Sequence, residues 1–148
     1  MVSFEKRKAR PSVILEWAIT CQNAEENEGR PNVLGLGVNG FFVKEEQLPA
    51  EIPCPVILAF RFDRSDIPGM VLGLNYRVTD PHGVETGSDR VGVEWNPGTA
   101  PRLVDPERII RVLMIPMMVR GRGQHTIEVW TDLEEPIRLP LLFSILDL

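Results

Sequence analysis

The chain has 148 residues, 43% hydrophobic and 25% charged, which excludes a disordered chain and predicts one globular domain. Its formal net charge of −5 argues against a dedicated nucleic-acid binder. No apolar run reaches the roughly 18 residues of a membrane span, and no signal-peptide pattern is visible, so we expect a cytoplasmic protein.

Residues 1–10 are expected to be a flexible tail, and residues 11–148 are expected to form the domain. Lys6, Arg7 and Lys8 give the tail a basic cluster, which is either a solvated terminus or a contact for an acidic partner. Cys21 and Cys54 are far apart and match no zinc spacing, so we expect two free thiols and no metal.

The segment Ser12–Thr20 predicts the first strand, because apolar residues alternate along it. Trp17 shares a face with Leu15 in this pattern and is expected in the core. Glu16 falls on the other face. It is either a carboxylate with a tuned pKa or a rim residue that reaches water, and we favour the rim residue. Residues 22–32 are polar and predict a loop.

Residues 33–43 predict one strand with three glycines. Gly35 to Gly40 fit the dinucleotide-binding pattern G-x-G-x-x-G by letter. That pattern requires a following helix, whereas here Pro49 interrupts the chain too early for one. We therefore expect no cofactor, and a bulge or close sheet packing explains the glycines.

The stretch 55–83 is the centre of the predicted fold. In residues 56–62 and 72–78 every second residue is a large apolar one, so one face is fully apolar, which predicts two strands of a central hairpin. Asp63 and Asp66 lie in the connection between them. Residues 80–83, Asp-Pro-His-Gly, have the residues of a type I turn, so His82 is expected to be exposed.

The C-terminal half predicts further strands. Residues 84–95 resemble two short strand pieces, and residues 106–115 fit either a strand or a helix, of which we favour the strand because β-branched residues dominate. Residues 125–131 and 137–146 predict the last two strands. Pro140 indicates that the final strand lies at a sheet edge or a bulge.

About eight short strands separated by turns predict an all-β protein, an antiparallel β-sandwich of Greek-key or immunoglobulin-like kind. The Cys–Trp–Cys signature of true immunoglobulin domains is absent. The expected core is formed by alternating apolar residues: Trp17, Leu58, Phe60, Leu72, Leu74, Tyr76, Ile127, Val129 and Phe143.

Several segments resemble those of a family of small bacterial and phage proteins of unknown function. The run 13–18 and the segment 29–37 are similar to an apolar strand with an acidic residue followed by G-K-x-x-h-x-G, where h is hydrophobic. Residues 123–132 are similar to the family's G-x-Y-x-h-x-h-x-x-D. Arg30 stands where lysine is usual and His125 where tyrosine is usual. The resemblance implies a cytoplasmic β-sandwich and assigns no catalytic residue.

The sequence favours a non-catalytic protein-interaction or assembly module that forms a homo-oligomer. No nucleophile with a base and an orienting group is visible, and both histidines fall in or next to turns. Its contacts are expected at a sheet edge, for which Ser12–Thr20 is the candidate, and at the turn that carries Met117, Met118, Arg120 and Arg122. One alternative is an enzyme or small-ligand-binding protein that uses Glu16, Asp63 and Asp66. Another is a nucleic-acid-associated protein that uses the basic tail, Arg120 and Arg122.

Overall fold

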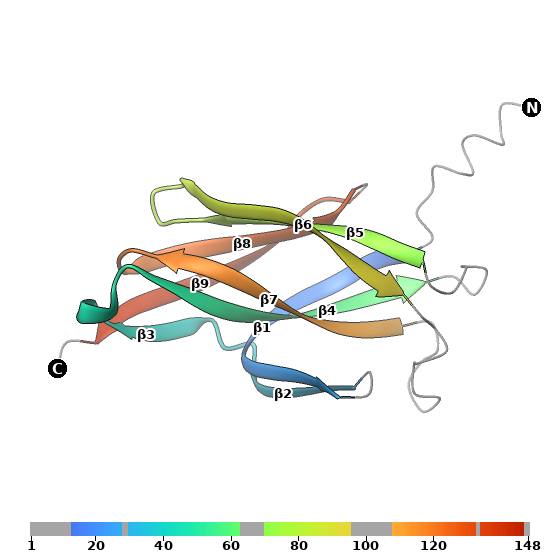
Figure 1. Ribbon diagram of the computed structural model, residues 1–148, viewed down its shortest axis with the longest axis horizontal. Coiled ribbons are helices and arrows are strands. Elements are labelled where there is room, and N and C mark those ends of the chain that lie inside the picture. The colour runs from blue at the N-terminus through green and yellow to red at the C-terminus, as the bar shows by residue number, and fades with distance from the viewer. Residues whose placement is uncertain (1–12, 28–29, 63–69, 96–107, 133, 147–148) are drawn as a thin grey trace, which may run out of the picture.

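The computed structural model describes residues 13–27, 30–62, 70–95, 108–132 and 134–146, which form nine β-strands in two sheets (Figure 1). The four-stranded sheet has the order β2 (Arg30–Leu36), β1 (Val13–Asn27), β4 (Ala50–Phe62), β7 (Arg108–Val119). The five-stranded sheet has the order β3 (Gly40–Lys44), β9 (Ile137–Leu146), β8 (Gly123–Thr131), β5 (Met70–Thr79), β6 (Glu85–Trp95). One 3-10 turn, η1 (Glu45–Gln47), follows β3, and the described residues contain no α-helix.

The strand order confirms the predicted immunoglobulin-like sandwich. Strands β1, β4 and β7 take the places of strands A, B and E, while β9, β8, β5 and β6 take those of G, F, C and C′. All pairings are antiparallel except one, because β3 runs parallel to β9. Residues 1–10, expected as a tail, lie outside the described residues.

The two sheets bury one hydrophobic core between them. Every residue predicted for the core contributes to it except Trp17. Phe60 of β4 and Phe143 of β9 are among its largest fully buried side chains. The alternating pattern of these strands therefore identifies the inward face correctly.

The placement of Trp17 in the core was wrong, and a β-bulge is the reason. The register between β1 and β4 shifts between Leu15 and Trp17, so Leu15 and Ala18 face the core and Trp17 turns to the outer face. Glu134, which precedes β9, stabilises the start of β1, since its Oε1 accepts a hydrogen bond from the backbone N–H of Leu15 at 3.1 Å. Strict alternation cannot foresee an inserted residue of this kind.

Residues 33–43 form parts of two strands in different sheets rather than one strand. Gly35 and Gly37 have φ angles of 67° and 81°, in the left-handed region that favours glycine. The backbone N–H of Gly37 donates to the carbonyl of Thr20 at 2.8 Å, after which the chain crosses to the other sheet and begins β3. Residues 22–32, predicted as a loop, mostly extend β1 and begin β2. The β1–β2 hairpin crosses the outer face of its sheet and approaches β7.

The predicted central hairpin does not form. Strands β4 and β5 follow each other in sequence but belong to different sheets, so they face each other across the core instead of pairing. Residues 84–95 form one continuous strand, β6, rather than two pieces. The favoured strand at residues 106–115 is confirmed from Arg108 onward as part of β7, and residues 106 and 107 lie outside the described residues.

Three prolines within strands lie in segments that pair with a neighbouring strand on one side only. Pro53 and Pro55 lie in the part of β4 that pairs only with β7, since β1 pairs with β4 only from Val56 onward. Pro140 lies in the part of β9 that precedes its pairing with β3. Because proline donates no N–H, it is tolerated where the backbone has a free side.

Candidate functional site

The acidic residues proposed for an enzyme or ligand site do not assemble into one among the described residues. Glu16 lies at the bulge of β1, partly exposed, with the Arg61 Nε atom 4.0 Å from its carboxylate. Asp63 and Asp66 lie outside the described residues, as do Lys6, Arg7 and Lys8. Within the described ranges no group of three His, Cys, Asp or Glu side chains is arranged to hold a metal ion.

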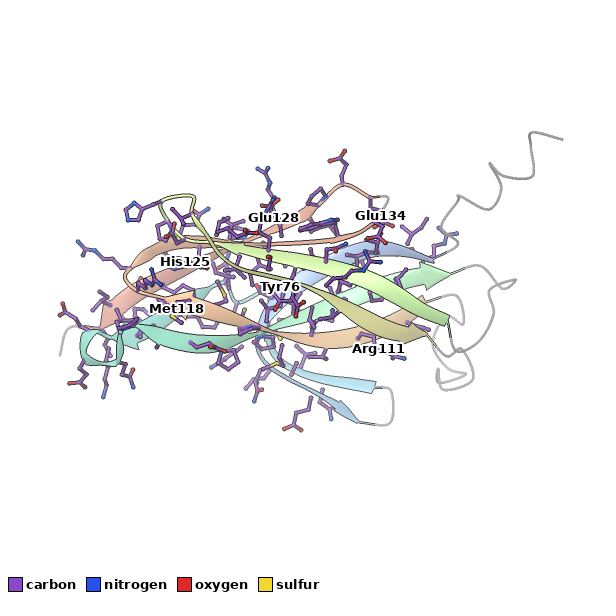
Figure 2. All side chains as sticks on the ribbon, turned by 45° about the horizontal axis from the view of Figure 1, so that its top comes forward. Tyr76, Arg111, Met118, His125, Glu128 and Glu134 are labelled. Carbon is purple, nitrogen blue, oxygen red and sulfur yellow. The ribbon has the colours of Figure 1, made fainter. Side chains whose placement is uncertain are left out.

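The other residues predicted for an interaction surface lie at or next to the turn between β7 and β8. One of them, Met117, does not reach the surface. Met117 is fully buried in the core, so its side chain is not part of the surface that we expected there. Its neighbour Met118 points the other way, because successive side chains in a strand alternate. Arg120 and Arg122 are exposed on the turn. Figure 2 shows Met118 and His125 together at one end of the molecule, far from Arg111 and Glu134.

A second turn, between β5 and β6, packs beside the first. The Gly83 N–H donates to the Asp80 carbonyl at 3.0 Å, which closes the predicted turn at residues 80–83. The Asp80 Oδ1 atom accepts from the N–H groups of Val84 and His82, at 2.9 and 2.8 Å. These hydrogen bonds, with the nearby histidines, lower the pKa of the Asp80 carboxyl.

Gly123 brings the two turns into contact. Its φ is 131°, and a Cβ atom there would lie 2.7 Å from the Cγ of Pro81. Only glycine allows the Pro81 ring to approach the backbone this closely without strain.

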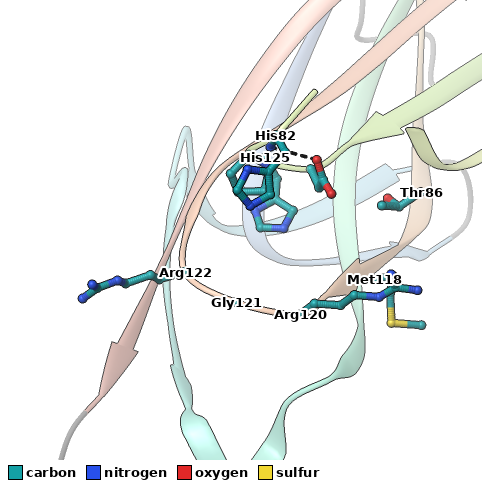
Figure 3. Close-up of a pocket in the computed structure, with 9 residues that line it drawn as sticks. His82, Thr86, Met118, Arg120, Gly121, Arg122 and His125 are labelled. Carbon is teal, nitrogen blue, oxygen red and sulfur yellow. Dashed lines mark hydrogen bonds between the residues drawn. The ribbon is translucent and has the colours of Figure 1, made fainter. Parts of the chain in front are cut away.

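Between the two turns is an open pocket of about 170 Å³, which we call the turn pocket (Figure 3). The β5–β6 turn and the start of β6 contribute one side, and the β7–β8 turn contributes the other. Arg120 and Arg122 leave their turn on opposite sides (Figure 3), and His82 and His125 both line the pocket. The lining residues are Asp80, Pro81, His82, Thr86, Met118, Arg120, Gly121, Arg122 and His125.

The sequence predicted only that His125 lies next to a turn, and the structure buries it at the pocket wall. Its Nδ1 atom lies 3.2 Å from the Gly123 carbonyl, and its ring meets the edge of Phe143, with centroids 5.0 Å apart. Immunoglobulin-like sandwiches often place a tyrosine at this corner, hydrogen-bonded to the backbone just upstream. The histidine makes the equivalent bond and keeps a second ring nitrogen, Nε2, for other partners.

The strand β3 is a second candidate site, which the sequence reasoning missed. It is the outermost strand of its sheet, so one side of its backbone has no neighbouring strand among the described residues. The Leu142 N–H donates to the Asn39 carbonyl at 2.7 Å, which fixes the hydrogen-bonding side of the ladder. By alternation, Phe41 and Val43 direct their backbone groups to β9, and Gly40, Phe42 and Lys44 direct theirs to the free edge.

An exposed apolar patch lies beside this free edge. The Phe42 side chain is 74% exposed, and Leu142 and Leu146, which flank its partner Ser144 on β9, are 53% and 39% exposed. We call Phe42, Leu142 and Leu146 the edge patch. Solvent-exposed apolar clusters on a sheet edge commonly mark an interaction site.

The rest of this outer face is polar and ion-paired. The Arg77 Nη2 atom lies 2.9 Å from a carboxylate oxygen of Glu128, and the Arg77 guanidinium also lies over the Trp130 ring. Arg90 forms a paired contact with Asp132. Among the described residues in the strands of this sheet, the exposed large apolar side chains are therefore those of β3 and β9.

Both cysteines are free, as predicted, and both are buried. Cys54 faces the core, whereas Cys21 lies opposite Pro55 on the outer face of the same sheet, 3.7 Å from the Pro55 carbonyl oxygen. Burial raises the pKa of the Cys54 thiol to about 12, so it stays protonated at neutral pH.

The sequence matches no known family model, and no curated protein is significantly similar to it. The resemblance to small bacterial and phage proteins therefore remains a prediction. In the part of the chain that the structure describes, no helix is long and apolar enough to cross a membrane.

Proposed function

We propose that this protein is a non-catalytic assembly module that pairs with a second copy of itself along β3. The observation that carries the proposal is the free edge of β3, which presents Phe42 at 74% exposure beside unpaired backbone groups. Keeping a phenylalanine in water is unfavourable, and an unpaired edge is a template for another strand.

The other outermost strands have protection that β3 lacks, and the free side of β1 at Val13–Thr20 carries the charged Glu16. Strand β2 contains Pro31 and β7 contains Pro116, and proline interrupts a ladder. Strand β6 carries several charged residues, among them Asp89 and Arg90. Strand β3, with the sequence GFFVK, has only Lys44 at its last position. Charges and prolines are the usual means of preventing edge-to-edge association, so β3 is the edge best suited to it.

The β3 edge is self-complementary in an antiparallel arrangement. If two copies pair about a two-fold axis with Phe42 opposite Phe42, both residues exchange N–H···O bonds, because their backbone groups face outward. Lys44 of each copy then lies opposite Gly40 of the other, and no like charges meet in the register. A parallel arrangement would instead place the two Lys44 side chains together.

Pairing of this kind would join two five-stranded sheets into one continuous sheet and place the two edge patches side by side. A short edge with a small apolar patch lies at the low end of interface sizes, so we expect an affinity of about micromolar strength. The two free thiols fit a reducing compartment, which supports a cytoplasmic location for the module.

The test is light scattering after gel filtration, from low micromolar to several hundred micromolar protein. We expect the mass to rise with concentration from the chain mass of 16.7 kDa towards twice that value. Phe42→Lys should hold the protein at the monomer mass, because it places two like charges opposite each other at the centre of the interface.

Leu34→Lys is the matched control, since Leu34 is 63% exposed on β2, on the other sheet, and the charge change is identical. That variant should dimerise like the unmodified protein. A monomer mass at every concentration, or equal dimerisation of the Phe42→Lys variant, would refute the proposal.

A further inference from the structure

We propose that the turn pocket binds a phosphate group, held by Arg120, Arg122 and the two histidines. This site is separate from the β3 edge and does not depend on dimerisation. It lies where the β5–β6 and β7–β8 turns meet (Figure 3).

The first observation that supports this site is that Arg120 and Arg122 have no ion-pair or hydrogen-bond partner among the described residues. Five of the arginines with described side chains have a carboxylate or a backbone carbonyl as partner: Arg61, Arg77, Arg90, Arg111 and Arg138. Arg120 and Arg122 have no such partner among the described residues, and both line the turn pocket. In a chain with a net charge of −5, two unpaired guanidinium groups at one pocket form a local excess of positive charge.

The second support is the histidine pair. His125 is buried and fixed, because its Nδ1 contacts the Gly123 carbonyl and its ring packs against Phe143. Its Nε2 atom has no hydrogen-bond partner among the described residues. His82 is exposed on the opposite turn. Each imidazole has a ring N–H that can donate a hydrogen bond to a group in the pocket.

The single carboxylate in the lining does not cancel this charge. One oxygen of Asp80 is occupied by the N–H groups of His82 and Val84, so this residue holds the turn in shape. The fully charged side chains of the lining are then two arginines and one aspartate.

The number and type of donors in the lining favour phosphate over a carboxylate. Arg120 and Arg122 leave one turn on opposite sides, while His82 comes from the other turn and His125 lies in the pocket wall. A phosphate offers acceptor oxygens in several directions, whereas a planar carboxylate offers them in one plane, and arginine binds phosphate with charge-assisted hydrogen bonds. The bound group is either free phosphate or a phosphate monoester.

The test is an NMR titration of the full chain with inorganic phosphate at constant ionic strength. We expect saturable shifts at the amides of Gly121 and Gly123 and at the Nε atoms of Arg120 and Arg122. The double variant Arg120→Gln/Arg122→Gln should bind at least about tenfold more weakly, since two charge-assisted contacts are lost.

The control is Arg61→Gln/Arg138→Gln, which removes the same charge at two exposed sites outside the pocket. It should bind phosphate like the unmodified chain. O-phosphoserine that binds more tightly than inorganic phosphate identifies a monoester as the ligand, and the reverse order identifies the free ion. Shifts that do not saturate, unchanged binding by the pocket variant, equal loss in the control or tighter binding of acetate would each overturn the proposal.

Discussion

Gly123 is the residue on which the geometry of the turn pocket depends. Its positive φ of 131° and the Pro81 ring that lies against it leave no room for a side chain. Gly121, two residues earlier in the same turn, has no positive φ, and a Cβ atom at that position would meet nothing within 4 Å. The turn therefore requires glycine at position 123 but not at position 121.

We predict that Gly123→Ala lowers the free energy of unfolding by about 1–3 kcal/mol, through backbone strain and the clash with Pro81. Gly121→Ala should change it by less than about 1 kcal/mol. Urea denaturation followed by circular dichroism measures both. Equal effects of the two substitutions would show that Pro81 does not rest on Gly123.

Trp17 and Phe60 show where residue patterns succeed and fail. Phe60 follows its alternation into the core, whereas Trp17 is diverted to the outer face by the bulge at Glu16. No local signal in the sequence marks that inserted residue, because Glu16 fits the polar side of a regular strand equally well.

The expected consequence is a difference in stability between two large-to-small substitutions. Phe60→Ala should cost about 3–5 kcal/mol, the range for a buried aromatic residue. Trp17→Ala should cost less, about 1–2 kcal/mol, since its side chain is only half-buried on the outer face. Chemical denaturation of the two variants decides this, and a larger loss for Trp17→Ala would contradict the register of β1.

The turn between β5 and β6 contributes to the stability of the folded protein in a pH-dependent way, through Asp80. The lowered pKa of Asp80 means that its ionised form is favoured in the folded state. Its contribution is therefore present above the pKa of the unfolded chain and is lost as the pH falls through the folded pKa.

We predict that Asp80→Asn lowers the melting temperature at about pH 7, and that this difference from the unmodified protein shrinks as the pH falls below the ordinary aspartate pKa and through the lowered pKa of Asp80. Thermal unfolding followed by circular dichroism across this range provides the measurement. A difference that stays constant with pH would mean that the charge of Asp80 has no role in the turn.

Most strands were predictable from the sequence, because alternation is a local property. The strands at residues 125–131 and 137–146 and the turn at residues 80–83 appear where the sequence places them. Strand pairing was less predictable, since it depends on partners distant in the chain. The sheet change after Gly37 and the separation of β4 from β5 are decided by packing of the whole sandwich.

At the scale of the molecule, the sandwich followed from the number of strands, but its interaction surfaces did not. The edge expected at Ser12–Thr20 is present among the described residues, since Val13–Thr20 pairs only with β4 and β2 joins β1 from Cys21 onward, but the edge at β3 was not foreseen. The adjacent Phe41 and Phe42 carried a usable signal, because consecutive strand residues point to opposite faces and one of them must leave the core. Met118, Arg120 and Arg122, expected at an interaction surface, line the turn pocket, and His125, which was not expected at that surface, lines it too.

Amide hydrogen exchange at Phe42 is the sharpest test of whether β3 pairs with β3 of a second copy. The amides of Phe41 and Val43 are directed to β9 and should be protected at every protein concentration. The Phe42 amide faces the free edge, so its exchange should slow as the protein is concentrated and return to a fast rate on dilution. Fast exchange of Phe42 at all concentrations, with Phe41 protected throughout, would contradict the account.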